Sequence, residues 1–276
     1  MRIRVLAENT TASEQLGCEH GLSLYIETKK YKLLFDTGAS TLFAENAAKM
    51  NIDLSQVDLA VISHGHYDHA GGLKTFLNIN DKAKVYLHQN AFQPCFAFRP
   101  NGSKAYIGLD KALMDNERLI FCGQSFIIDE GLELFSNVKG DKRAPSGNSD
   151  LFKLVGENFL PDDFTHEQNL VISEGGKKLL IAGCAHNGIL NILDRFYADK
   201  GCMPDYVIGG FHLFNPLTKE SEDPAVIAEI GQYLLDTKAK YYTCHCTGME
   251  AYQRLKAIMG DKIDYLSGGN ELTIEA

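Results

Sequence analysis

Residues 59–72 carry the feature that most restricts the fold: an apolar run followed at once by metal-binding side chains. The apolar residues 59–62 are predicted to form a buried strand. Three histidines and one aspartate then occupy six consecutive positions, as His64, His66, Asp68 and His69. Imidazole and carboxylate groups bind borderline divalent metals such as zinc. Because functional loops need a rigid scaffold, the pattern predicts a metal site at the edge of a sheet.

The pattern His-x-His-x-Asp-His resembles the signature of the metallo-β-lactamase superfamily. The resemblance implies an α+β fold, an αββα sandwich of two mixed β-sheets flanked by helices, with one or two metals at one edge. It also implies that His64 and His66 serve one metal, whereas Asp68 and His69 serve the second. Asp36 follows another predicted strand, and the resemblance implies that it braces the metal loop without being a ligand.

Three later histidines, His186, His212 and His245, also follow predicted apolar strands. By the resemblance, His245 fits the last ligand, on the second metal. We expect His186 to complete the first metal site. His166 is the alternative, because it precedes a strand where the superfamily often places that ligand. The expected catalytic residues are Asp68, which would orient or accept a proton from water, and His212, which would contact the substrate or a developing anion.

Cys184 stands where the superfamily usually has a bridging aspartate, so the chain departs from the common pattern here. Cysteine binds zinc as a thiolate, and Cys184 is therefore either a ligand or a small buried residue. The expected cofactor is one or two divalent metal ions, with zinc favoured and manganese or iron as alternatives.

Short segments along nearly the whole chain resemble one branch of the superfamily, which includes the dihydropterin-ribofuranosyl-aminobenzene-phosphate synthases. These segments are residues 8–9, 19–23, 35–38, 183–186, 209–213 and 245–248. The resemblance implies a metal-dependent hydrolase acting on a small, anionic substrate. The alternative within the branch is a synthase-like transferase that releases pyrophosphate. The alternative of another class is a non-catalytic metal-binding or sensing module.

Composition restricts the partners and the compartment. The formal net charge of −9 argues against binding to nucleic acid or to anionic membranes, which requires a basic surface. No signal peptide and no transmembrane run is apparent in the sequence. The 7 cysteines are scattered and odd in number, which is typical of reduced thiols, and we therefore expect a cytoplasmic protein. The oligomeric state is left open.

We expect residues 1–276 to form a single domain with an insertion around residues 91–118. In this insertion the apolar residues follow neither a helical nor a strand periodicity. Residues 137–150 are predicted to form a basic loop, which combines Lys139, Lys142 and Arg143 with glycine and proline. Such a loop is either a solvated surface loop, the favoured interpretation, or a clamp that folds over an anionic substrate.

Overall fold

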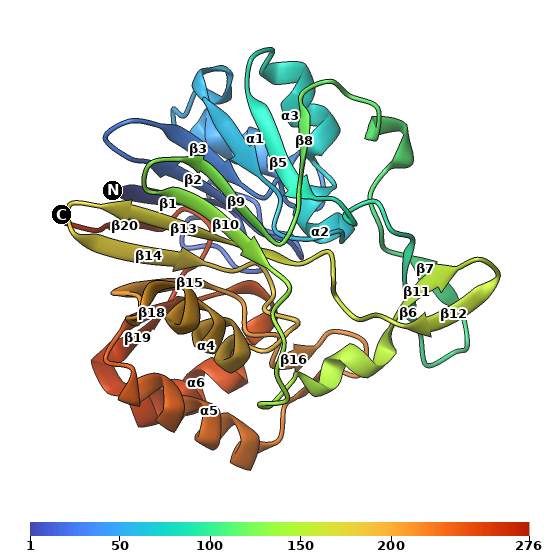
Figure 1. Ribbon diagram of the computed structural model, residues 1–276, viewed down its shortest axis with the longest axis vertical. Helices are drawn as coiled ribbons and strands as arrows, with labels where there is room; N and C mark the ends of the chain where they lie inside the picture. Colours follow the sequence, from blue (N-terminus) through green and yellow to red (C-terminus); the bar gives the residue numbers. More distant parts are fainter. Residues whose placement is uncertain (276) are drawn as a thin grey trace.

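Two seven-stranded sheets lie face to face in the computed structural model, which describes residues 1–275 (Figure 1). The strands of the first sheet are β1 (Arg2–Ala7), β2 (Ser23–Glu27), β3 (Lys32–Phe35), β4 (Leu59–Val61), β5 (Lys84–His88), β8 (Leu119–Cys122) and β20 (Glu271–Thr273). Their order is β20-β1-β2-β3-β4-β5-β8. Pairing is antiparallel from β20 to β3 and parallel from β3 to β8. The parallel strand β4 is wholly buried, as its continuous apolar sequence predicts.

The second sheet repeats this mixed pattern. Its strands are β9 (Ser125–Asp129), β10 (Leu132–Ser136), β13 (Gln168–Glu174), β14 (Lys177–Ile181), β15 (Tyr206–Gly209), β18 (Lys240–Thr243) and β19 (Ile263–Tyr265). They follow the order β19-β18-β15-β14-β13-β10-β9. Pairing is antiparallel from β9 to β14 and parallel from β14 to β19. In both sheets, therefore, the parallel strands end at a common edge.

Helices cover the outer face of each sheet (Figure 1). The first sheet carries α1 (Leu42–Lys49), α2 (Tyr67–Ala70) and α3 (Leu73–Ile79), and the second carries α4 (Ile189–Lys200), α5 (Pro224–Asp236) and α6 (Met249–Met259). Helix α5 shows why: Ile227, Ile230 and Leu234 are buried at helical spacing. Asp223 caps its first turn by accepting a hydrogen bond from the Ala225 N–H.

Three apolar layers hold the sandwich together. The central layer lies between the sheets and includes the fully buried Leu24, Phe35, Leu170 and Ile208. The two outer layers lie under the helices of each half. This layering confirms the predicted α+β fold with αββα architecture.

A small third sheet lies beside the sandwich and includes part of the expected insertion (Figure 1). It joins β6 (Cys95–Phe98) and β7 (Lys104–Tyr106) to β11 (Leu151–Val155) and β12 (Asn158–Pro161), in the order β12-β11-β6-β7. Sequence reasoning found no strands here. Phe98 stacks on Phe152 with ring centroids 4.0 Å apart, and Phe96 packs against Phe159 at 5.0 Å. These strands depend on contacts between distant segments, which a search for local periodicity misses.

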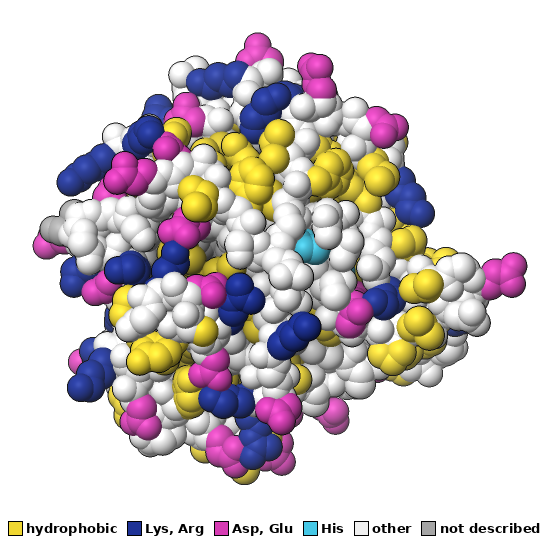
Figure 2. Space-filling model, in the orientation of Figure 1, with side chains coloured by type: hydrophobic (Ala, Val, Ile, Leu, Met, Phe, Trp, Pro, Cys, Tyr) yellow, Lys and Arg dark blue, Asp and Glu magenta, His cyan; other side chains and the backbone are white. Residues whose placement is uncertain are grey.

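The remaining short elements connect the layers. They are the paired strands β16 (Phe214–Asn215) and β17 (Glu220–Ser221) and the 3₁₀ turns η1 (Leu54–Gln56), η2 (Lys111–Leu113), η3 (Ser146–Asp150), η4 (His245–Thr247) and η5 (Gly260–Lys262). Across residues 1–275, no helix combines the length and apolar character needed to span a bilayer. Figure 2 shows acidic and basic side chains interspersed over the visible face.

Candidate metal centre

The candidate ligands lie on loops that follow strands of both sheets, at one edge of the sandwich. Four non-glycine residues on these loops have positive φ angles: Asp36 (60°), Ala185 (53°), His212 (51°) and His245 (51°). This region of backbone conformation is unfavourable for residues with a Cβ, and such residues cluster at functional sites. The loops therefore hold strained turns in the segments that carry the candidate ligands.

The first group of ligands contains His64, His66 and His186. The ring centroid of His64 lies 4.6 Å from that of His66 and 5.0 Å from that of His186, and those of His66 and His186 are also 5.0 Å apart. All three side chains are buried, and the Nε2 atoms of His64 and His186 have no hydrogen-bond partner within the described residues. Leaving a buried polar atom unpaired costs about 1–3 kcal/mol, so the group fits a bound metal ion.

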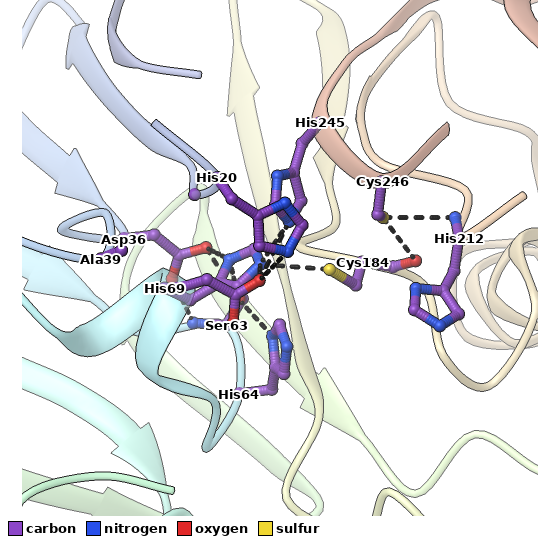
Figure 3. Close-up of polar contacts among 12 residues, drawn as sticks. His20, Asp36, Ala39, Ser63, His64, His69, Cys184, His212, His245 and Cys246 are labelled. Atoms are coloured by element: carbon purple, nitrogen blue, oxygen red, sulfur yellow. Dashed lines mark hydrogen bonds and ion pairs between the residues drawn. The ribbon is translucent and has the colours of Figure 1, made fainter. Parts of the chain in front are cut away.

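The second group contains Asp68, His69 and His245. Figure 3 shows His69 and His245 beside Cys184. His69 Nε2 lies 3.2 Å from His245 Nε2, and Asp68 Oδ2 lies 3.3 Å from His245 Nε2. The Cys184 Sγ is part of the same cluster, 3.1 Å from His69 Nε2. The structure thus brings all six expected ligands together in two adjacent groups.

The tautomers of the second group are set by neighbours on the outer side of each ring. His69 Nδ1 lies 2.6 Å from Asp36 Oδ2, and His245 Nδ1 lies 2.7 Å from Asn9 Oδ1. Both partners are acceptors, so each Nδ1 carries the proton. The two Nε2 atoms then face each other with lone pairs, an arrangement that requires a cation or an additional proton between them.

The first group is held in the same way. His186 Nδ1 lies 3.0 Å from Asn148 Oδ1, while the amide of Asn148 donates to the His186 carbonyl. Ser63 Oγ lies 2.7 Å from Asp36 Oδ2 and 2.8 Å from His64 Nδ1, so it donates to the former and accepts from the latter. Both histidines therefore present an unprotonated Nε2 to the site.

Buried carboxylates fix the backbone of the ligand loops. Asp36 accepts a hydrogen bond from the Ser63 N–H (2.7 Å), which is the bracing position that the resemblance implied. Glu8 accepts from the His245 N–H, and Glu167 accepts from the His186 N–H, each at 2.6 Å. Sequence reasoning gave Glu8 and Glu167 no such role. The available signal was a charged residue directly beside an apolar strand.

His166, the alternative ligand, lies behind the first group. Its Nδ1 accepts a hydrogen bond from the Gly65 N–H (3.1 Å), so its Nε2 carries the proton and faces Asp162 Oδ2 at 3.2 Å. His166 and Asp162 form a separate buried cluster with Cys95 and with His66, which thus lies between this cluster and the first group. Asp162 Oδ2 also lies 3.9 Å from His66 Nε2, where it favours a proton on that nitrogen and leaves Nδ1 for a metal. Asp162 was also missed by sequence reasoning.

The pKa values of the buried histidines differ between the groups. Burial, reinforced by the neighbouring histidines, holds the pKa values of His64 and His186 well below their usual range. Burial also lowers the pKa of His69, but the carboxylates of Asp36 and Asp68 outweigh it and raise this pKa to about 9. At neutral pH the metal-free second group therefore holds a proton where the first group has bare lone pairs.

A cavity of about 310 Å³ opens onto both groups. Asp68 and His212, the two expected catalytic residues, line it. The His212 ring lies 4.3 Å from that of His186, and its Nδ1 is buried without a partner among residues 1–275. His20 also lines the cavity, with its Nε2 3.3 Å from Asp68 Oδ2; sequence reasoning had not included it in the site.

The basic loop does not place its cations at this cavity. Lys142 Nζ pairs with Asp194 at 2.6 Å, and Arg143 Nε donates to Glu229 at 2.6 Å. These ion pairs with acidic side chains of α4 and α5 agree with the favoured interpretation, a surface loop, and not with the alternative of a substrate clamp for these two residues. The basic residue that lines the cavity is Arg99, between β6 and β7.

Comparison with known proteins agrees with this architecture. Residues 16–226 match the model of the metallo-beta-lactamase superfamily. A solved structure, Tm1679, described as a metal-dependent hydrolase of the beta-lactamase superfamily, is 30% identical, covers 100% of both chains and superposes with a TM-score of 0.83.

Two curated proteins of Methanocaldococcus jannaschii are also similar over most of their length. One is an uncharacterised protein, 28% identical over 93% of this chain and 94% of its own. The other is 7,8-dihydropterin-6-methyl-4-(beta-D-ribofuranosyl)-aminobenzene-5'-phosphate synthase, 27% identical over 91% of this chain and 89% of its own, as the predicted branch implied. The ligand loop, the sandwich and these matches agree: the chain belongs to the metallo-β-lactamase superfamily.

Proposed function

We propose that this protein is a divalent-metal-dependent hydrolase that acts on a small, anionic substrate. The observation that carries the proposal is a cluster of buried, unprotonated imidazole nitrogens beside the cavity, which His186 and His245 line directly. His64 and His186 offer such atoms in the first group, and His245 offers one in the second. Lone pairs that face one another in a buried site fit metal ions better than they fit a packed core.

The donor set indicates which residues would hold each ion. His64, His66 and His186 would hold the first, and Asp68, His69 and His245 the second. Nitrogen ligands with one carboxylate suit zinc, and manganese or iron remain alternatives. When bound, such an ion polarises the substrate and lowers the pKa of a coordinated water toward about 7.

The protein's own groups supply the other requirements of hydrolysis. Asp68 lies at the cavity wall, where its carboxylate would orient the attacking water or accept its proton. His20 hydrogen-bonds to Asp68 and restrains the position of that carboxylate. His212 directs an unpaired ring nitrogen into a buried position beside the first group, which suits contact with a developing anion.

Arg99 supports an anionic substrate. Its guanidinium forms no ion pair with a carboxylate in the described part of the chain, although the protein is acidic overall. The adjacent cavity wall is apolar and includes Ala97, Ile107, Leu151 and Leu217. This wall suits a substrate with an apolar part and a negative group.

A synthase-like transfer that releases pyrophosphate is the second candidate. The similarity to the dihydropterin synthase favours it. The two candidates differ in what attacks the substrate: hydrolysis uses water, whereas transfer uses an aromatic second substrate. Product analysis with and without an added aminobenzene acceptor therefore separates them.

We predict that His186→Ala reduces zinc affinity far more than His166→Ala. Loss of His186 removes a ligand, whereas loss of His166 removes only a residue behind His66, for which a cost of about 10–100-fold is usual. Titration of the metal-free variants with zinc against a chromophoric chelator measures both affinities. A larger loss in His166→Ala would reverse the ligand assignment.

We predict that zinc binding to the second group tightens as the pH rises from 6 to 9. Since Asp36 and Asp68 raise the pKa of His69 to about 9, zinc must displace a proton below that pH. For each displaced proton, the apparent zinc affinity should fall about tenfold for every unit that the pH is lowered below 9. The slope should be smaller in Asp36→Asn. Equal affinity across this range in the wild type would show that His69 carries no displaceable proton.

We predict that His212→Ala lowers kcat of the zinc-loaded protein by about 100-fold, the usual effect of removing one donor to a developing anion, without loss of zinc. The substrate comes from a screen of phosphodiesters, phosphomonoesters, carboxylic esters and lactones. His88→Ala is the matched control, because His88 is a buried histidine that does not line the cavity.

Arg99→Ala in the same assay tests whether Arg99 binds the negative group of the substrate. KM should rise for the charged substrate and stay unchanged for a neutral analogue. If no compound is hydrolysed with zinc, manganese or iron, the hydrolase proposal is wrong.

A further inference from the structure

We propose that Cys184 is a ligand shared by the two metal positions, with its thiolate bridging them. This inference rests on the metal centre proposed above. It assigns to Cys184 one of the two roles that its sequence position left open.

Cys184 clusters with members of both ligand groups. Its Sγ clusters with ligand atoms of Asp68, His69 and His245, and also with those of His64 and His186; within each cluster the atoms lie within 4.8 Å of one another. Within residues 1–275, no other side chain joins these two clusters. Cys184 is also buried, at 2% exposed, and it lines the cavity that opens onto both groups.

Electrostatics favours an anion at this position. Two divalent cations in adjacent sites repel strongly where water is excluded. Among the six proposed ligands Asp68 alone carries a negative charge, and it belongs to the second group. A thiolate between the groups adds a second negative charge, which attracts both ions and reduces the repulsion between them. When the Cys184 sulfur binds a metal ion, its S–H bond is replaced by a sulfur–metal bond, and the proton passes to solvent.

The local backbone fixes Cys184 in this place. A Cβ on the preceding Gly183 would lie 2.2 Å from Ser63 Oγ and 3.1 Å from His64 Nδ1, so the Cys184 loop packs directly against the ligand loop. The following Ala185 has a φ of 53°, and His186 of the same turn enters the first group. The turn thus presents a sulfur and an imidazole to the metal centre from one short segment.

Cys246 provides a matched control. It is buried nearby, and its Sγ contacts the backbone: it accepts from the His212 N–H (3.3 Å) and donates to the Cys184 carbonyl (3.6 Å). It clusters with Cys184 and His212 but with neither of the two metal groups. Replacing Cys246 therefore removes a neighbouring thiol without removing the proposed bridge.

X-ray absorption of the full-length protein loaded with two zinc ions per chain tests the bridge directly. A bridging thiolate is a ligand of both ions, so the average is about one sulfur among the roughly four ligands of each zinc. A thiolate bound to one ion only gives an average of about half a sulfur per zinc. A value near one half, or no sulfur, would overturn the bridge. This measurement needs no variant, so it holds even if a substitution prevents folding.

Cobalt loading identifies the cysteine. The cobalt-substituted wild type and Cys246→Ala should show the sulfur-to-cobalt absorption band in the near ultraviolet, and this band should be absent from Cys184→Asp and Cys184→Ala. Cys184→Asp should still bind two ions, because carboxylate restores the negative charge, whereas Cys184→Ala should lose affinity for one ion by more than about 100-fold. A band that survives in Cys184→Ala would contradict the assignment. A band without hydrolysis would leave the bridge in place and remove the hydrolase proposal.

Discussion

The close approach of two histidine Nε2 atoms is the constraint on which this structure depends. His69 and His245 bring their Nε2 atoms within 3.2 Å of each other, and the outer hydrogen bonds to Asp36 and Asn9 keep the protons on the far side of both rings. Such an arrangement is unfavourable in a metal-free protein unless a proton intervenes. The raised pKa of His69 shows how that proton is held. A metal ion would take its place.

The sandwich makes this arrangement possible because it supplies many strand ends at one edge. The loop after β4 carries the ligands from His64 to His69, while those after β14 and β18 carry His186 and His245. These loops combine strained turns with buried carboxylates that hold their backbone N–H groups. The cost of the strained turns and of burying charge is offset by the packed layers between and outside the sheets.

The resemblance of the His-x-His-x-Asp-His loop to a known signature was sufficient for the fold class. The six candidate ligands could be named from the sequence because strand ends and this loop are short-range patterns. The sequence favoured His186 over His166 from the preceding apolar strand, but it could not show which ring nitrogen of either residue is already hydrogen-bonded. It also missed Asp162 and Arg99, which reach the site from segments far away in the chain. The clamp alternative for the cationic loop stayed open for a related reason: local charge does not reveal that Asp194 and Glu229 lie beside it.

Anomalous diffraction at the zinc absorption edge, from crystals of the zinc-loaded protein, tests the central claim most directly. Two separate peaks are expected, one within the group of His64, His66 and His186 and the other beside Asp68, His69 and His245. A folded, zinc-saturated protein with no peak in either group would contradict the account. Zinc bound only at the cluster of Cys95, Asp162 and His166 would contradict it equally.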